Sequence, residues 1–386
     1  MRVLHVIPFL DPVQGGPPIF VLDLVATLTE MGIQSTIVTT QRPGERRMIS
    51  TDFRVITFSC DLPWYRYSSR LWMWLLENAA SFDLFHVHYL FTFPSFAAAR
   101  IGRLGKVPYV LHPHGVLNVW GLRHRRPLLK RAWLRLFERP ILRDAATVLY
   151  ASDEEKAEAT LTHLSENSQI LPYAVRPPRA DRIQLARAFH QRRPSRQSLL
   201  VLYLSRLDPK KGLEVLIPAW GAIISRFPGA LLLIAGSGSP AYEHSLRQLA
   251  SRHGIEHHIA FLGFLSGEER WAALAAADVF VLPSYSESFG IAVIEAMCVG
   301  TPVVLSNAVA LSRAVREACA GLVTPCSVEG VAESLTTMLA DSELRYRAGE
   351  KARQLADRFC SLEAVAQRLK IIYEEITRRS NSPRGD

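Results

Sequence analysis

Two carboxylates stand where the C-terminal half of the sequence could bind an anion. Glu287 falls in a loop after an apolar run, and Glu295 falls within the predicted helix that follows. The backbone N–H groups near Phe289, Gly290 and Ile291 would lie at the start of this helix, where the helix dipole favours a phosphate. The two carboxylates would then address different parts of one extended ligand. On position alone, Glu295 is better interpreted as a solvated helix residue, because Glu is a good helix former.

Two further loops of the same half carry residue types suited to a diphosphate. Arg206 and Lys211 follow one apolar run, and Gly236 and Gly238 follow the next. Arginine offers a planar fork and lysine a point charge to phosphate oxygens, and glycines would let a ligand lie against the backbone. Alone, each loop is typical of a solvated connection. Since the carboxyl ends of parallel strands meet at one sheet edge, we expect the three segments to form one anion site.

Histidine pairs mark two extended segments of the N-terminal half, His86 with His88 and His112 with His114. Alternate residues of a strand face the same side, so each pair could ligate zinc or iron in a hydrolase. Against this alternative, Asp83 is the one carboxylate close to them in the sequence, and the phosphate-binding loops would be left unexplained. Chelator-sensitive activity would favour the hydrolase.

Positive charge is concentrated in the segment Arg123–Arg143 of a chain whose formal net charge is +9. Against the single acidic residue Glu138, its basic residues are Arg123, Arg125, Arg126, Lys130, Arg131, Arg135, Arg139 and Arg143. Tryptophans and leucines are interleaved with them, which suits a basic amphipathic helix on a membrane of acidic lipid. A helix whose apolar stripe packs on its own domain fits the pattern equally well. Nucleic-acid binding is a further alternative, but no recognisable module for it occurs.

Apolar, β-branched runs alternate with helical patterns along the chain, which indicates parallel sheets flanked by helices. In the first half the predicted strands are Val3–Phe9, Ser35–Thr40, Arg54–Phe58, Leu84–His88, Tyr109–His112 and Thr147–Tyr150. In the second half they are Leu199–Leu204, Ala230–Ala235, Ile259–Leu262, Val279–Leu282, Pro302–Leu305 and Gly321–Val323. The sequence therefore predicts an α/β protein with two independently wound, Rossmann-like sheets.

The chain of 386 residues is too long for one ordinary core, since single cores stop growing at roughly 250 residues. The strand pattern lapses at 179–198, which we predict to be a linker between domains at 1–178 and 199–357. The five cysteines are odd in number and far apart, so neither disulfides nor structural zinc are expected. A signal peptide and a membrane-spanning run are not recognisable, which makes a cytoplasmic protein the default.

The motifs of both halves resemble those of the retaining GT-B glycosyltransferases of family four, the glycosyl transferases group 1 class. In the second half they are Ser-Arg206-Leu-Asp-Pro-Lys-Lys211-Gly, Ala-Gly236-Ser-Gly238, Phe-Leu-Gly263-Phe and Glu287-x7-Glu295. In the first half they are Gly15-Gly16, the strand Phe82-Asp83-Leu-Phe-His86-Val-His88 and the turn His112-Pro-His114-Gly115. The likeness covers essentially the whole chain. It departs at Pro17-Pro18, which stiffens the glycine loop, and at Tyr173-Ala174, where the family often has Asn-Gly.

The resemblance implies two facing Rossmann-like domains with a central cleft, and a helix at 358–380 that crosses back to the acceptor-side N-terminal domain. Arg206 and Lys211 would hold the donor's diphosphate with the amides of 289–291, and Glu295 would bind the ribose hydroxyls. Glu287 and His114, as the catalytic residues, would contact the transferred sugar. The other implied contacts are Gly16 from the N-terminal domain, Gly236, Gly238, Phe264 and Leu265 near the base, and Asn118 and Trp120 on the acceptor side.

The implied activity is transfer of a sugar from a UDP- or GDP-linked donor to a saccharide, with retention of configuration. The chain has no Asp-x-Asp motif for a divalent ion, so the cations and the helix start must stabilise the departing diphosphate. We therefore expect neither a metal ion nor a cofactor. A lipid-linked acceptor, attachment to the inner membrane face and a role in cell-surface polysaccharide synthesis are further expectations, and no nucleic-acid partner is expected. An epimerase or phosphorylase of the same fold is the alternative.

Overall fold

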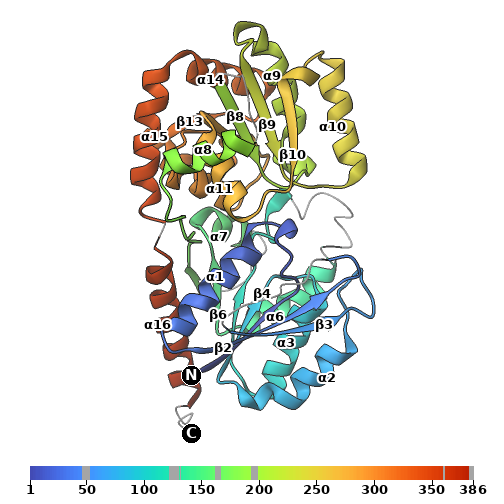
Figure 1. Ribbon diagram of the computed structural model, residues 1–386. Helices are drawn as coiled ribbons and strands as arrows, with labels where there is room; N and C mark the ends of the chain where they lie inside the picture. Colours follow the sequence, from blue (N-terminus) through green and yellow to red (C-terminus); the bar gives the residue numbers. More distant parts are fainter. Residues whose placement is uncertain are drawn as a thin grey trace. The chain divides into compact units, whose positions relative to one another are not determined.

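The computed structural model describes residues 1–45, 53–120, 130, 132–160, 167–192, 199–359 and 361–381 (Figure 1). Contacts between residues divide the chain into two units. Unit 1 consists of Met1–Tyr173 and Leu362–Asp386, and unit 2 consists of Ala174–Ser361. Each unit contains its own parallel sheet, so each has an edge at which strand ends can gather functional residues.

Unit 1 is built on a parallel sheet whose described strands have the order β3-β2-β1-β4-β5-β6-β7. They are β1 (Arg2–Ile7), β2 (Gln34–Gln41), β3 (Arg54–Ser59), β4 (Leu84–His88), β5 (Tyr109–His112), β6 (Thr147–Tyr150) and β7 (Ser168–Ile170). The first six coincide with the predicted runs apart from small differences at their ends. β7 was missed because its sequence, Ser-Gln-Ile, is too short and polar to form a recognisable apolar run.

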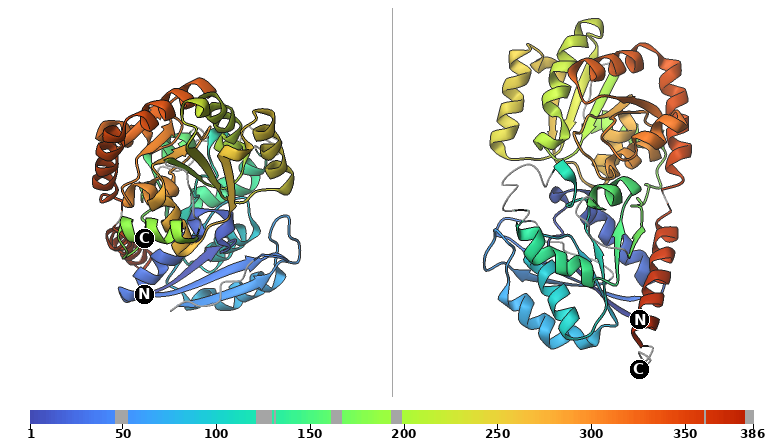
Figure 2. Two further views of the ribbon diagram at one scale, coloured as in Figure 1. Left: turned by 45° about the horizontal axis from the view of Figure 1, so that its top comes forward. Right: turned by 180° about the vertical axis from the view of Figure 1, so that it is seen from behind.

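Helices pack against this sheet. The α- and π-helices in the described residues are α1 (Gly16–Glu30), α2 (Ser69–Asn78), α3 (Phe93–Leu104), the π-helix η3 (Leu134–Glu138), α6 (Arg139–Asp144), α7 (Asp153–Thr160) and α16 (Leu362–Asn381). Helix α16, from the end of the chain, packs against α1 near its beginning, and Figures 1 and 2 show the two side by side. This confirms the expectation that a C-terminal helix returns to the first domain.

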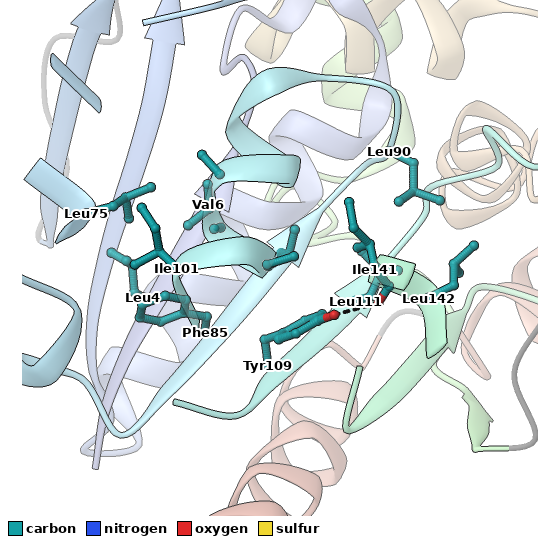
Figure 3. Close-up of a cluster of buried hydrophobic side chains, with 14 of the residues drawn as sticks. Leu4, Val6, Leu75, Phe85, Leu90, Ile101, Tyr109, Leu111, Ile141 and Leu142 are labelled. Carbon is teal, nitrogen blue, oxygen red and sulfur yellow. Dashed lines mark hydrogen bonds between the residues drawn. The ribbon is translucent and has the colours of Figure 1, made fainter. Parts of the chain in front are cut away.

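Alternation along the strands gives the unit 1 sheet one strongly apolar face. Leu4 and Val6 of β1 and Phe85 of β4 point into a cluster that includes side chains of α2 and α3 (Figure 3). Tyr109 lies in the same cluster, and its phenol donates to the carbonyl oxygen of Ile141 at 2.6 Å. Residues at the intervening strand positions point to the opposite face. That face carries the histidines.

Unit 2 is also built on a parallel sheet, in which the described strands have the order β10-β9-β8-β11-β12-β13. They are β8 (Leu199–Leu204), β9 (Ala230–Ala235), β10 (Ile259–Gly263), β11 (Val279–Leu282), β12 (Val303–Ser306) and β13 (Gly321–Thr324). The described α-helices are α8 (Arg182–Arg192), α9 (Leu213–Ile223), α10 (Pro240–Arg252), α11 (Gly267–Ala276), α12 (Ile291–Cys298), α13 (Ser312–Ala318), α14 (Val328–Ala340) and α15 (Ser342–Ala356). Two parallel-sheet units of this kind, with α16 returning to α1, confirm the predicted fold class.

The segment 179–198, predicted as a linker, contains α8, which packs against α11 within unit 2. The guanidinium of Arg182 donates to the carbonyl oxygens of Ala275, Ala277 and Gly300. Residues 193–198 lie outside the described residues. The domain boundaries given above stay predictions.

One expectation about cysteines is wrong. Cys298, at the end of α12, is disulfide-bonded, whereas Cys60, Cys319 and Cys326 are free thiols. Sequence spacing could not reveal this, because it does not show which cysteines the fold brings together. Within the described parts of the chain, no helix has both the length and the apolar character needed to cross a membrane.

Candidate functional site

Three loops of unit 2 meet where β8, β9 and β11 end. The N–H of Leu207 donates to the carbonyl oxygen of Ser237 at 2.9 Å, which joins the loop after β8 to the loop after β9. The N–H of Tyr285 donates to the carbonyl oxygen of Lys210 at 2.9 Å, which joins the loop after β8 to the loop after β11. The structure therefore brings the three predicted anion-binding segments together at one sheet edge.

The glycines after β9 allow these loops to approach each other closely. A Cβ on Gly236 would lie 1.8 Å from the carbonyl oxygen of Ser205, and a Cβ on Gly238 would lie 2.3 Å from that of Leu207. No real Cβ tolerates such distances. The two glycines thus make room for the neighbouring loop. The sequence interpretation had assigned this space to a ligand instead.

Glu287 lies in a cationic environment at this edge. Its carboxylate forms an ion pair with Lys211 Nζ, and the side chain of Lys211 is only 9% exposed. Burial alone would raise the pKa of Glu287. Lys211, Lys210 and Arg206 outweigh burial, so this pKa lies below the usual value of a glutamate. Arg206 is itself exposed, which places a guanidinium at the accessible side of the cluster.

The helix α12 begins at Ile291, after the loop that carries Glu287 and Phe289. Gly290 is its N-cap residue with φ 96°, a left-handed conformation that glycine adopts readily, and no side chain caps this end in the described structure. Phe289 is 3% exposed and packs edge-on against Phe359, with ring centroids 6.1 Å apart. Its ring is therefore part of the packing of unit 2. The first turn of α12, from Ile291, is a helix start of the kind that can bind an anion.

Glu287 is anchored by a segment that sequence reasoning did not identify. Its N–H donates to the carbonyl oxygen of Ala308 at 3.0 Å, and its carbonyl oxygen accepts from the N–H of Ala310 at 2.9 Å. These two bonds fix the loop residue as firmly as a strand residue. The sequence Ala308–Ala310 carries no functional group, so no pattern could have indicated this role.

Glu295 is buried rather than solvated, since it is only 4% exposed. Its Oε1 forms an ion pair at 3.1 Å with Nη2 of Arg270, whose side chain is 14% exposed. The solvated interpretation of Glu295 is therefore wrong. Sequence reasoning missed Arg270 because Glu268-Glu269-Arg270 is typical of a charged, exposed helix start. The N–H of Gly236 donates to the carbonyl oxygen of Gly263 at 2.8 Å, which joins the loop after β9 to the end of β10. The buried Leu265 lies just beyond Gly263, in the loop before α11.

In unit 1, five buried histidines form a layer on the polar face of the sheet: His5, His86, His88, His112 and His114, called here the histidine layer. Strand register places His5 beside His86, and His88 beside His112. His88 Nε2 lies 3.3 Å from His5 Nδ1, and His88 Nδ1 lies 2.9 Å from His114 Nε2. Burial lowers the pKa of all five, to about 3 for His5 and His112. The layer is therefore uncharged at neutral pH.

Two tyrosines extend the histidine layer. The Oη of Tyr373, from α16, lies 2.6 Å from His86 Nδ1, and the Oη of Tyr173 lies 2.6 Å from His114 Nδ1. A polar contact thus ties α16 to the sheet. Both ring nitrogens of His114 have partners inside unit 1, which leaves its ring less available to a sugar than the sequence interpretation supposed.

The histidine layer contains two groups of three imidazoles whose nitrogens lie within 4.8 Å of one another. They are His5, His86 and His88, and His88, His112 and His114. Neither group includes a carboxylate. His88 and His114 already direct ring nitrogens at each other, at His5 and at Tyr173. A metal ion would have to replace these contacts, which weighs against the zinc or iron hydrolase.

The turn at His114 is held by a buried carboxylate. His114 has φ 56°, which is uncommon for a residue with a Cβ. Glu155 Oε1 accepts from the N–H of Gly115 at 2.6 Å, and Glu155 Oε2 accepts from the N–H of Ala151 at 2.7 Å. Glu155 was missed because the acidic start of α7 looks solvated in the sequence, although this residue is only 2% exposed.

The remaining predicted residues of unit 1 lie near helix starts. Gly16 begins α1, and Pro17 and Pro18 occupy its first turn, where a missing N–H costs little. The amide nitrogen of Asn118 donates to the carbonyl oxygen of Gly115, so this buried side chain supports the turn. Trp120 is partly exposed, and residues 121–129 after it lie outside the described residues.

The basic segment is described only in part, since residue 131 also lies outside the described residues. Leu136 is 67% and Phe137 39% exposed, and Arg135 and Arg139 beside them are exposed too. Ile141, in contrast, is buried. The apolar side chains are thus divided between surface and core, which fits both interpretations of this segment.

Two family models match the chain. The model of glycosyl transferases group 1 matches residues 187–355, and that of the glycosyl transferase 4-like domain matches residues 15–174. The chain belongs to the glycosyl transferases group 1 family. It is a nucleotide-sugar-dependent glycosyltransferase of the GT-B fold, as the resemblance implied.

Similar proteins span the whole length of this glycosyltransferase. The D-inositol 3-phosphate glycosyltransferase of Corynebacterium glutamicum (strain R) is 28% identical over 99% of this chain and 98% of its own. Sucrose-phosphate synthase from Thermosynechococcus elongatus has a TM-score of 0.79 at 23% identity, over 98% of this chain and 100% of that one. Anabaena HepE, solved with UDP and glucose, has a TM-score of 0.80 at 18% identity, over 97% and 99% of the two chains. The two structures support the fold.

Proposed function

We propose that this glycosyltransferase moves a sugar, with retention of configuration, from a UDP- or GDP-sugar to a lipid-linked saccharide in cell-surface polysaccharide synthesis. The observation that carries the donor half of the proposal is the cation cluster around Glu287 at the start of α12. Arg206 is exposed, and Lys210 and Lys211 lie close enough to lower the pKa of that glutamate. A nucleoside diphosphate matches this charge and the helix start beside it.

This end of the unit 2 sheet can catalyse the transfer by stabilising the negative charge that develops on the departing diphosphate. Fixed cations and amides that face a leaving oxygen stabilise its negative charge without reorganising. Arg206, Lys211 and the first turn of α12 are therefore assigned to the diphosphate, and no metal ion is required. Glu295 is assigned to the ribose, with Gly236, Gly238 and Leu265 near the base.

The transferred sugar is assigned to Glu287 and His114, with Gly16 as a further donor contact. For Glu287, the low pKa supports a carboxylate that accepts hydrogen bonds from sugar hydroxyls. For His114, a bond from the ring to the sugar would have to replace the contact with Tyr173 or His88. If the sugar instead contacted the turn at Gly115, His114 would keep its contacts with both Tyr173 and His88.

The acceptor half of the proposal rests on the exposed surface of η3, with Asn118 and Trp120 assigned to the acceptor saccharide. Leu136, Phe137 and the neighbouring arginines combine apolar and basic side chains, as interfacial membrane segments do. Trp64, which is 74% exposed, stacks on Tyr65, and Tyr65 contacts Trp133 just before η3. This surface would place the enzyme on an anionic lipid layer at the inner membrane face.

A thermal-shift screen against UDP-, GDP- and ADP-sugars tests the donor assignment. We expect the UDP- or GDP-sugar to raise the unfolding temperature, and Arg206→Ala to remove that shift. Addition of EDTA should change neither binding nor donor hydrolysis. Absence of stabilisation by every donor would overturn the assignment, and phosphate-dependent release of a sugar phosphate would indicate a phosphorylase instead.

Cosedimentation with vesicles tests the membrane assignment. The wild-type chain should bind vesicles that contain acidic phospholipid and not purely zwitterionic ones, with binding reduced at high salt because surface charge is screened. Leu136→Ser with Phe137→Ser should lower binding several-fold. The exposed pair Tyr346→Ser and Ile371→Ser is the control. Equal binding to both kinds of vesicle would contradict the proposed surface.

A further inference from the structure

A buried ion pair connects two helices of unit 2 at the proposed donor site. Arg270 lies in the first turns of α11, and Glu295 lies in α12. Their charged atoms are 3.1 Å apart, and the two side chains are 14% and 5% exposed. The helices α11 and α12 also pack against each other. The guanidinium therefore holds the carboxylate from a neighbouring helix.

Stability does not account for this pair. Removing two charges from water costs several kcal/mol, and buried ion pairs are often replaced by apolar residues without loss of stability. The pairing of Arg270 is also incomplete, since its Nε is buried and has no hydrogen-bond partner among the described residues. A buried donor without a partner adds a further cost. An arrangement with these costs calls for a functional explanation.

We propose that Arg270 is a positioning residue that orients the carboxylate of Glu295 toward the ribose hydroxyls of the donor. The same contact makes Arg270 a determinant of preference for ribonucleotide over 2′-deoxyribonucleotide donors. This inference rests on the proposed function, in which Glu295 binds the ribose. It assigns a role to a side chain outside the motifs that led to that function.

The geometry of a carboxylate explains how the positioning works. Two oxygens offer about four acceptor positions, and Arg270 engages Oε1, which fixes the rotation of the group. A ribose diol can then be bound by lone pairs that already have the correct direction. Without the guanidinium, the buried carboxylate can rotate, and its negative charge has lost its partner.

The preference for ribose follows from the cost of an unpaired acceptor. A 2′-deoxyribose lacks one of the two hydroxyls, so a carboxylate held in place would keep a buried acceptor that the ligand no longer satisfies. A rigid site penalises this loss more strongly than a site whose carboxylate can turn away. Discrimination between the two sugars is therefore expected to depend on Arg270.

Isothermal titration with UDP, GDP and their 2′-deoxy forms tests the inference. The wild-type chain should bind the ribonucleotide at least about tenfold more tightly than its deoxy form. Arg270→Met should weaken ribonucleotide binding about tenfold and bring the ratio close to one, and Arg270→Lys should restore part of it. Because Arg270 acts through Glu295, the double variant Arg270→Met with Glu295→Gln should bind no more weakly than Glu295→Gln alone.

Two controls separate this role from a structural one. Arg247→Met removes the same charge from the surface of α10, where Arg247 pairs with Glu243 and lies over Phe261, and it should leave affinity and ratio unchanged. Removing one partner of a buried ion pair lowers stability, so urea unfolding should place Arg270→Met below the wild type, and binding is compared under conditions in which both chains are fully folded. Should Arg270→Met not fold, Arg270→Lys is compared instead.

The outcomes distinguish the inference from the function on which it rests. If Glu295→Gln loses the ribonucleotide but Arg270→Met keeps wild-type affinity and ratio, the donor site stands and the role of Arg270 is overturned. Additive losses in the double variant would overturn it as well. If neither UDP nor GDP binds the wild-type chain, the proposed function fails and the inference fails with it.

Discussion

At the scale of single residues, Lys211 and Glu287 show how one ion pair can set the charge of a binding edge. Both side chains are mostly buried, so each charge depends on the other for compensation. The cations around Glu287 keep its pKa low, which leaves a carboxylate among cations at neutral pH. A bound diphosphate would then share Lys211 with Glu287 rather than replace it.

Loss of Lys211 should therefore destabilise unit 2 as well as weaken donor binding. Lys211→Met leaves Glu287 mostly buried without its main partner, and we expect the free energy of unfolding to fall by about 3 kcal/mol. Adding Glu287→Gln should recover part of this loss. Arg206→Ala, at an exposed position, should stay within about 0.5 kcal/mol of wild type. Urea unfolding checks all three, and equal losses for Lys211→Met and Arg206→Ala would contradict the buried pair.

At this scale, the sequence predicted which residues would lie together when charged residues directly follow the predicted strands. Arg206, Lys211 and Glu287 all follow predicted strands, and the structure brings them together. Arg270 and Glu155 were missed for a physical reason. Burial of a charged residue depends on which helices pack together, and a local charge pattern contains no information about that packing.

At the scale of elements, the turn after β5 depends on a carboxylate from α7. Glu155 accepts from the N–H groups of Gly115 and Ala151 and so joins the ends of β5 and β6. A turn in which His114 has a positive φ persists only when its surroundings enforce it. Glu155 thus braces this turn, although it is assigned no contact with substrate.

Glu155→Ala should loosen this turn. Two buried N–H groups would lose their acceptor, at about 1–3 kcal/mol each, so we expect unit 1 to be destabilised by about 2–4 kcal/mol. Glu155→Gln keeps one acceptor and should cost less. The exposed neighbour Glu154 provides the control, since Glu154→Ala should unfold like wild type. Thermal unfolding followed by circular dichroism distinguishes these, and equal effects of Glu154→Ala and Glu155→Ala would contradict the bracing role.

The elements themselves were largely predictable, because buried parallel strands form continuous apolar runs. The exceptions have physical causes. Pro302 was included in a predicted strand, but it has no N–H, and β12 begins at Val303. The segment 179–198 has the composition of a linker, yet Arg182 anchors α8 to unit 2 through three carbonyl oxygens. The composition of a segment does not reveal which carbonyl oxygens the fold leaves near it, so this anchoring could not be predicted.

At the scale of the whole molecule, the two units differ in their buried histidines. Both units bury an ion pair, Arg66 with Glu45 in unit 1 and Arg270 with Glu295 in unit 2, whereas the buried histidines of the described residues all lie in unit 1. Every histidine with a lowered pKa belongs to unit 1. The two units should therefore respond differently to acid.

Acid should destabilise unit 1 first. A histidine whose pKa falls on folding contributes stability that is fully present above its unfolded pKa of about 6.5, and this contribution is lost as the pH falls further. For His5 and His112, with folded pKa values of about 3, the loss continues down to that pH. Between these two pKa values, each of the two histidines lowers the free energy of unfolding by about 1.4 kcal/mol for every pH unit of acidification. Hydrogen exchange at pH 5 should thus expose β4 before β11, and the reverse order would contradict the buried neutral layer.

The variant His112→Leu isolates one member of the histidine layer. Neither ring nitrogen of His112 has a hydrogen-bond partner among the described residues, so leucine removes no such bond. Between pH 7.5 and pH 5 the wild type should lose about 2 kcal/mol more than the variant, since only the wild type takes up this proton on unfolding. A change in packing cancels in this comparison, because it is the same at both pH values. His244→Leu, at an exposed position of α10, is the matched control. Parallel stability curves for wild type and His112→Leu would mean that His112 is protonated in the folded chain, and a charged histidine layer would then have to be compensated by groups other than the tyrosines and imidazoles around it.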